Sequence, residues 1–212
     1  AQGEYYLTDV IGLLAAAGQP LATVKSERPE EIMGPNDRKA LARTEAKMRQ
    51  EILDRIMEAG VTVIDPASTY LDPRVQIGRD TTLYPGVIIM GETKIGANCR
   101  IGPYTQITSS VVGDDSHVYF SNLTNATLGE KVEVGPYTHL RPGTIVADQG
   151  KVGGFVEIKN STVGVNSKVP HLSYIGDTTI GAEVNIGAGT ITCNYDGVRK
   201  WPTVIGNRAF IG

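Results

Sequence analysis

Aliphatic residues recur at every sixth position over most of the chain, with occasional steps of five, and a glycine often follows directly. A period of six fits neither an amphipathic helix nor an alternating strand. A fixed short period over more than a hundred residues indicates a repeat architecture. The registered positions are Ile77, Leu83, Ile89, Ile95, Ile101 and Ile107, then Val112 and Val118, then Leu128, Val134, Leu140, Val146, Val152 and Ile158, then Val163, Val169 and Ile175, and then Ile180 and Ile186.

This repeat predicts a mainly β fold, a parallel β-helix whose coil has a triangular cross-section. One aliphatic residue on each of three short strands points into the narrow interior. Glycine or another small residue is expected at the corners, where positive φ or close backbone approach is needed. Each coil then uses roughly 18 residues, and about seven and a half coils stack by parallel strand pairing.

A different pattern precedes the repeat. Residues 4–17 have the spacing of a short amphipathic helix, and residues 21–25 favour a strand. Residues 36–60 predict a longer helix with one apolar stripe, capped by Asn36 or Asp37 and ended by Gly60. The predicted organisation is therefore a remnant of a larger domain at 1–35, a linker helix at 36–62, and the β-helix at 63–212. The register still runs at the last residue, so we expect the chain to be truncated at both ends.

Composition narrows the functional classes. The chain has 212 residues and a net charge of −3, which gives no electrostatic case for nucleic acid or an anionic membrane. The first residues have no basic region typical of a signal peptide, and no apolar run approaches the ~20 residues of a membrane span. The two cysteines, Cys99 and Cys193, fit a reducing compartment. These features predict a cytoplasmic protein.

The three histidines, His117, His139 and His171, occupy different phases of the repeat. This spacing predicts no zinc site of the kind found in γ-type carbonic anhydrases.

Polar residues interrupt the repeat in its second half. Arg141 and Lys159 are 18 residues apart, one coil, so they are expected to lie one above the other. Two stacked cations are unfavourable unless an anion lies between them. The alternative is two solvated cations with separate carboxylate partners. Glu157 lies two residues from Lys159 and is expected on the same face.

Further candidates follow in the next coils. His171 is either a surface residue or a general base, and Tyr174 and Asn185 are polar positions near it in the repeat. Residues 193–202 contain Asn194, Asp196, Gly197 and Pro202, which favour a loop that leaves the coil. The alternative role of this loop is to absorb a one-residue slip of the register before Ile205.

Several segments together resemble the family of bacterial bifunctional GlmU enzymes, which combine N-acetylglucosamine-1-phosphate uridyltransferase and glucosamine-1-phosphate acetyltransferase activities. The segments are GEYYLTD, GPNDR, HLRPG, GGFVEIKNS, HLSYIGD and VNIGAGTITCNYDG, followed by an Arg-Lys pair. The resemblance covers essentially the whole chain. It implies a left-handed parallel β-helix of hexapeptide repeats, assembled as a homotrimer with active sites between subunits, and preceded by the α/β tail of a Rossmann-like nucleotidyltransferase domain.

The resemblance also implies roles for individual residues. His171 is expected to be the general base for acetyl transfer from acetyl-CoA. The sugar phosphate is expected on Arg141, Lys159, Tyr174, Asn185 and Lys200, and acetyl-CoA near Ala188, Asn194 and Tyr195. From the spacing and the chemistry, we add that Glu157 could orient the imidazole and that Asn194 or nearby backbone N–H groups could stabilise the oxyanion.

Some features depart from the family or leave alternatives open. Asn36 matches a family Mg²⁺ ligand, but the Gly-rich nucleotide loop and the metal-binding Asp are missing, so we predict no uridylyl transfer by this chain. Mg²⁺ would serve only that activity in a full-length parent. Cys193 permits a ping-pong route through an acetyl-thioester, with direct transfer preferred. The remaining alternatives are an acyltransferase for another amino sugar and a non-catalytic trimeric scaffold.

Overall fold

The computed structural model describes residues 6–27 and 34–212, which divide into two compact units, Ala1–Thr44 and Glu45–Gly212. In the first unit, helix α1 spans Asp9–Ala16. It confirms the helix predicted at 4–17, whose residues 4 and 5 lie outside the described part. The strand predicted at 21–25 is wrong, because no described residue forms a ladder with it and a strand exists only through its neighbours.

Helix α2 spans Arg38–Glu58, close to the predicted limits. The cap is Asp37 rather than Asn36, since the Asp37 carboxylate accepts a hydrogen bond from the Ala40 N–H. Within the second unit, Leu53 and Ile56 are buried against the first coil. The Arg49 side chain also holds helix α2 to this coil. It donates a hydrogen bond to the Ala67 carbonyl, and its guanidinium carbon lies 4.4 Å from the centroid of the Tyr70 ring.

The described part of the second unit holds three parallel sheets, and successive strands of the chain visit them in turn. Sheet A contains β1 (Thr62–Val63), β4 (Thr82–Leu83), β7 (Arg100–Ile101), β10 (His117–Val118), β13 (Glu133–Val134), β16 (Lys151–Gly154), β19 (Lys168–His171), β22 (Asn185–Ile186) and β24 (Phe210–Ile211). Sheet B contains β2 (Tyr70–Leu71), β5 (Ile88–Met90), β8 (Gln106–Thr108), β11 (Asn122–Thr124), β14 (His139–Leu140), β17 (Glu157–Lys159) and β20 (Tyr174–Gly176). Sheet C contains β3 (Gln76–Ile77), β6 (Lys94–Ile95), β9 (Val111–Val112), β12 (Thr127–Leu128), β15 (Ile145–Val146), β18 (Thr162–Val163), β21 (Thr178–Ile180) and β23 (Thr203–Ile205), and a short 3-10 turn, Pro66–Ser68, precedes β2.

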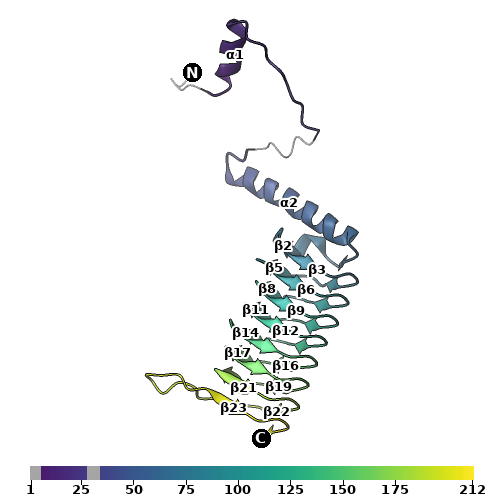
Figure 1. The fold of residues 1–212 in the computed structure, drawn as a ribbon. Coiled ribbons are helices and arrows are strands. Elements are labelled where there is room, and N and C mark those ends of the chain that lie inside the picture. Colours follow the sequence, from purple (N-terminus) through teal and green to yellow (C-terminus); the bar gives the residue numbers. More distant parts are fainter. Residues whose placement is uncertain (1–5, 28–33) are drawn as a thin grey trace. The chain divides into compact units, whose positions relative to one another are not determined.

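The aliphatic column predicted from the period of six forms the core. Residues such as Leu83, Ile107, Ile158 and Ile175 are fully buried, and each pairs in register with its counterpart one coil away, as Ile158 does with Leu140 and Ile175. Figure 1 shows the resulting stack of coils. The predicted fold class, mainly β with a left-handed parallel β-helix of hexapeptide repeats, is confirmed.

The corners differ in one respect from the prediction. Positive φ is found mostly at non-glycine residues, among them Phe155, Asn160 and Asp177. The glycine that follows an aliphatic residue has another function: a Cβ at Gly113 would overlap the carbonyl oxygen of Gly129 in the next coil. Close backbone approach, the second of the two predicted reasons, therefore explains the repeated glycine.

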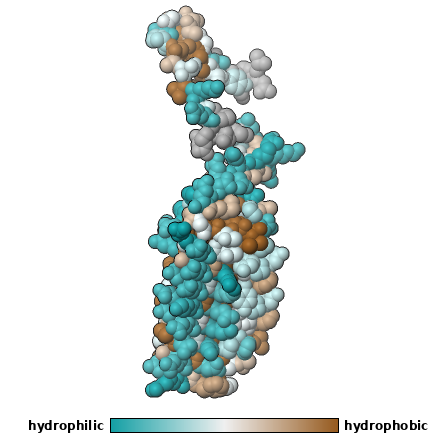
Figure 2. Space-filling model, turned by 90° about the vertical axis from the view of Figure 1, so that its right-hand side faces the viewer, coloured by the Kyte–Doolittle hydropathy of each residue, from teal (hydrophilic) through white to brown (hydrophobic). Residues whose placement is uncertain are grey.

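Large side chains stay outside the coil. Tyr104, Phe120, Tyr137 and Phe155 stack at one line of corners with ring centroids 5.2–5.9 Å apart. Figure 2 shows one face of the coil, on which hydrophilic residues lie beside residues of intermediate hydropathy and smaller hydrophobic patches. Among the described helices, neither is long and apolar enough to cross a membrane.

Candidate active site

Arg141 and Lys159 come together as the one-coil spacing predicts. Strands β14 and β17 pair with His139 opposite Glu157 and Leu140 opposite Ile158, which puts Arg141 in line with Lys159. The Arg141 guanidinium lies 2.8 Å from the Glu157 carboxylate. Arg141 therefore has a carboxylate partner, as the alternative interpretation required, but this partner neutralises only one of the two cations.

A third cation joins them from the loop after β22. The neighbouring ammonium of Lys200, and then the guanidinium of Arg141, lower the pKa of Lys159 from its ordinary value. Among the ion pairs of residues 6–27 and 34–212, none involves Lys159 or Lys200. The end of sheet B thus holds three cations, and with Glu157 paired to Arg141 and Asp177 close by, one positive charge remains in excess, which suits an anion.

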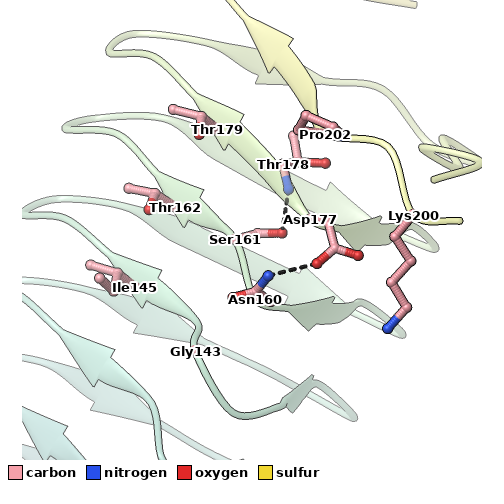
Figure 3. A pocket seen from close by; sticks show the side chains of 10 residues that line it. All are labelled: Gly143, Ile145, Asn160, Ser161, Thr162, Asp177, Thr178, Thr179, Lys200 and Pro202. Carbon is pink, nitrogen blue, oxygen red and sulfur yellow. Dashed lines mark hydrogen bonds between the residues drawn. The ribbon is translucent and has the colours of Figure 1, made fainter.

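Asp177 lies beside this cluster, at the corner between sheets B and C. Its two carboxylate oxygens accept hydrogen bonds from the side-chain amides of Asn160, at 2.6 Å, and Asn194. The Asn160 bond is the largest cause of a lowered pKa of Asp177, and the Asn194 bond, Lys200 and Lys159 act in the same direction. Figure 3 shows Asn160, Asp177 and Lys200 lining one open pocket of about 520 Å³.

Residues 193–202 leave the coil as predicted, in the yellow loop of Figure 1. Asp196 organises this loop: its carboxylate accepts hydrogen bonds from the backbone N–H groups of Val198 and Arg199 and from the indole N–H of Trp201. An antiparallel bridge between Tyr195 and Lys200 closes the hairpin. The loop is therefore a defined structure that presents Lys200, and it is more than a register slip.

The Asp196 bonds predict an acid transition of the loop. They lower the pKa of Asp196 from 3.8 to about 2. A carboxyl group whose pKa is lower in the folded state contributes stability above its unfolded pKa and loses it as the pH falls through the folded pKa. We expect the loop to stay closed down to about pH 4 and to open as the pH falls toward 2.

Trp201 is the only tryptophan in the chain, so its fluorescence measures this transition directly. An Asp196→Asn variant should show a smaller transition in that range, because Asp177 also binds this loop through Asn194 and its pKa is lowered too. A transition of unchanged size in the variant would assign the whole change to another carboxylate.

His171 and Tyr174 lie one coil beyond Phe155. His171 ends β19 and is exposed, and within the described residues no hydrogen bond to its imidazole is found. Glu157, predicted to orient the imidazole, is instead engaged by Arg141. Tyr174 is half-buried and lines a mostly apolar pocket of about 440 Å³ together with Phe155 and Ile191.

The other predicted residues are distributed over different parts of the chain. Asn194 is buried, and Tyr195 is exposed with its hydroxyl donating to the Gly197 carbonyl. Asn185 lies in sheet A, paired with Lys168 and Phe210, whereas the cation cluster lies at the end of sheet B. Ala188 is exposed at the following corner, and Asn36 is exposed in the first unit. One chain therefore assembles Arg141, Lys159 and Lys200, and keeps Asn185 on another sheet.

Metal ligands do not gather in the part of the chain that the structure describes. No group of three or more His, Cys, Asp or Glu side chains that could hold a metal ion occurs there. Both cysteines are unpaired, Cys99 buried and Cys193 exposed.

Sequence reasoning missed Asp177, Asn160 and Asp196. Asp177 ends the HLSYIGD segment and lies 17 residues from both Asn160 and Asn194. That interval is close to one coil, so it was the available sign that these polar side chains stack. Asp196 had only the turn signal of Asp-Gly, which does not reveal that its carboxylate accepts a hydrogen bond from the indole five residues further on.

Comparisons with known proteins show what the chain is similar to. The bacterial transferase hexapeptide family, described by six repeats, matches residues 74–109. "Bifunctional protein GlmU" of Carboxydothermus hydrogenoformans is 51% identical over 212 residues, all of this chain and 48% of that protein. The protein of the same name from Pelotomaculum thermopropionicum is 51% identical, with 46% of it covered. The chain thus spans about half the length of these relatives.

Among solved structures, the UDP-N-acetylglucosamine acyltransferase from Campylobacter jejuni is 17% identical, with 62% of each chain covered and a TM-score of 0.35.

Proposed function

Over all 212 residues this chain is a relative of the bifunctional GlmU proteins, and from this premise we propose that it transfers the acetyl group of acetyl-CoA to the amine of glucosamine 1-phosphate. The reaction would serve the synthesis of UDP-N-acetylglucosamine. The observation that supports it most is the cluster of Arg141, Lys159 and Lys200, whose charge exceeds that of its one ion-pair partner. A sugar phosphate brings the missing negative charge.

Acetyl transfer needs a base, and His171 has the required exposure. The acceptor amine attacks the thioester carbonyl carbon, a C–N bond forms, and the amine proton passes to the imidazole. The C–S bond then breaks, and the thiolate of coenzyme A leaves and takes up a proton. An imidazole suits this exchange because its ordinary titration range lies near neutral pH.

The residues around the thioester would stabilise the oxyanion and hold the coenzyme. The side-chain amide of Asn194 already donates a hydrogen bond to Asp177. The backbone N–H groups beside Asn194 are therefore the better donors for the oxyanion. Tyr195 and Ala188 are exposed and available to acetyl-CoA. Glu157 would orient Arg141 for the phosphate rather than orient His171, because its carboxylate accepts a hydrogen bond from Arg141.

The proposed active unit is a homotrimer. Asn185 lies in sheet A, away from the cation cluster at the end of sheet B. A second copy that brings its sheet A against sheet B of the first would unite these residues in one site. We place this assembly in the cytoplasm.

The rest of the parent protein would perform the second activity. We propose that residues 1–35 end a uridyltransferase domain, that 36–62 link it to the β-helix at 63–212, and that Mg²⁺ serves uridylyl transfer from UTP. Asn36 would be one ligand of that metal. Its side chain is not needed to cap helix α2, because Asp37 caps it. Its fellow ligands would come from outside this chain, so this chain alone is not expected to transfer uridylyl groups.

A thiol-release assay tests the proposal. Acetyl-CoA with glucosamine 1-phosphate should release coenzyme A and give an acetylated sugar phosphate by mass, and unphosphorylated glucosamine should be at least tenfold poorer in kcat/KM, about 1.4 kcal/mol. The full natural chain that contains this sequence is the enzyme to use. Equal rates on both sugars would favour an acyltransferase for another amino sugar, and no release at all would favour a trimeric scaffold.

A further inference from the structure

Three polar side chains stack at the corner where the loop leaves the coil. Asn160, Asp177 and Asn194 follow one another at intervals of 17 residues, and the carboxylate in the middle accepts one hydrogen bond from each amide. We call this set the amide–carboxylate ladder. The lower bond ties Asp177 to the coil beneath it, and the upper bond ties it to the first residues of the loop.

The upper part of the ladder is closely packed. Asn194 is only 6% exposed although the residues on either side of it, Cys193 and Tyr195, are exposed. The Asn194 amide nitrogen and the Tyr174 hydroxyl both lie over Gly176, where a Cβ would overlap them. The Asn194 carbonyl also accepts the backbone N–H of Trp201 at the other end of the loop. Holding Asn194 therefore holds both ends of the loop.

We propose that Asp177 is a positioning residue that clamps Asn194 and thereby places Lys200 beside Lys159 for the phosphate of the acceptor. This inference rests on the proposed function for its substrate, although the clamp itself does not. Neither oxygen of Asp177 needs a contact with the substrate, since both are already bound to amides.

The charge of Asp177 supports the same role. The titratable groups around it are Lys159 on β17, Lys200 on the loop and, further away, Arg141 with its partner Glu157. Asp177 opposes the lowering of the Lys159 pKa that Lys200 and Arg141 cause. It thus helps the Lys159 ammonium stay charged beside Lys200 before the substrate arrives.

Asp177→Asn tests the clamp with little backbone effect. Asp177 has φ of +49°, and asparagine tolerates this left-handed conformation as well as aspartate does. The amide removes the negative charge that strengthens both bonds and leaves one acceptor oxygen for two donors, so the bond from Asn194 is weakened or lost. Loss of a charged hydrogen bond should raise the opened population of the loop about tenfold or more.

Two signals measure that opening without any catalytic assay. Tryptic cleavage after Arg199 and Lys200 should accelerate about tenfold, because cleavage follows the opened population, and acrylamide should quench Trp201 more strongly. Asp148→Asn is the matched control: Asp148 also accepts a hydrogen bond at a corner, from the Glu130 N–H, but far from the loop in sequence. Unchanged cleavage and quenching in Asp177→Asn would overturn the clamp.

Two further variants separate the contributions of the two hydrogen bonds to Asp177. Asn194→Ala should reproduce the opening, whereas Asn160→Gly should leave Trp201 nearly unchanged, because Asn160 binds the coil beneath and glycine keeps the φ of +45° found there. If Asn160→Gly opened the loop as much as Asn194→Ala, the ladder would be a general stabiliser and the proposal would fail.

The kinetic consequence is a rise in KM for glucosamine 1-phosphate of about tenfold, because Lys200 would bind the phosphate in the ground and transition states alike, and any fall in kcat would come from the proposed oxyanion donors beside Asn194. A fall in kcat with KM unchanged would contradict placement of Lys200 for the phosphate. If the unaltered protein released no coenzyme A, the proposed function would fail, and cleavage and quenching would still decide the clamp.

Discussion

His171→Ala is expected to lower kcat for acetyl transfer by roughly 10²–10⁴-fold, the contribution of a general base. His171 is exposed at the end of β19, so its removal leaves no cavity and no unpaired buried group. KM for the sugar phosphate should change little, because the cations that would bind the phosphate lie on other strands. The thermal midpoint should also stay close to that of the unaltered protein.

Steady-state kinetics with Cys193→Ala as the matched control separate direct acetyl transfer from a ping-pong route through an acetyl-thioester on Cys193. Cys193 is exposed and unpaired, and it lies next to Asn194 in the loop. In direct transfer the alanine variant retains activity close to that of the unaltered protein. A loss as complete as that of His171→Ala, or an acetylated Cys193 trapped by mass spectrometry, would establish the ping-pong route instead.

The β-helix could be predicted because its determinants are local and repeated. Ile158 and Val163 belong to a column in which each residue faces the same interior, so the period in the sequence is the period of the coil. The 18-residue spacing of Arg141 and Lys159 follows from that period, and the register of β14 and β17 confirms it. Any pair of residues on the regular coil can be placed in this way.

The corners could not be predicted in the same detail. Phe155 and Asp177 adopt positive φ although glycine is the usual residue there, because the coil closes around a core that outweighs the local preference. At Phe155 the outward-facing ring stacks on Tyr137. The sequence has no marker for such a position, since each corner residue differs from the next.

The loop was predicted only as a departure from the coil. That Lys200 returns beside Lys159 depends on the three bonds of Asp196 and on the upper rung of the amide–carboxylate ladder. These contacts join residues in an irregular segment, where no period relates one position to another. The position of Lys200 beside Lys159 was therefore expected only from a family resemblance, and its physical cause became visible only in the structure.

Lys159→Met is expected to raise KM for glucosamine 1-phosphate by roughly 10–100-fold with kcat nearly unchanged, since a hydrogen bond between charged groups contributes about 1.5–3 kcal/mol. Methionine keeps much of the apolar stem and removes only the ammonium. The same change should leave the free energy of unfolding unaltered or slightly higher, because Lys200 and Arg141 repel Lys159 in the free protein and lower its pKa. Lower affinity without lower stability distinguishes a binding cation from a structural one.

The measurement is kcat/KM for glucosamine 1-phosphate and for glucosamine, together with urea denaturation of each variant. Lys159→Met should lose its preference for the phosphorylated sugar, since the lost interaction is with the phosphate alone. Lys94→Met is the control, an exposed lysine in sheet C whose neighbours in register are Gln76 and Val111. Equal losses on both sugars, or a fall in the free energy of unfolding in Lys159→Met, would show that this ammonium stabilises the coil. The excess charge at the end of sheet B would then need another explanation than the phosphate.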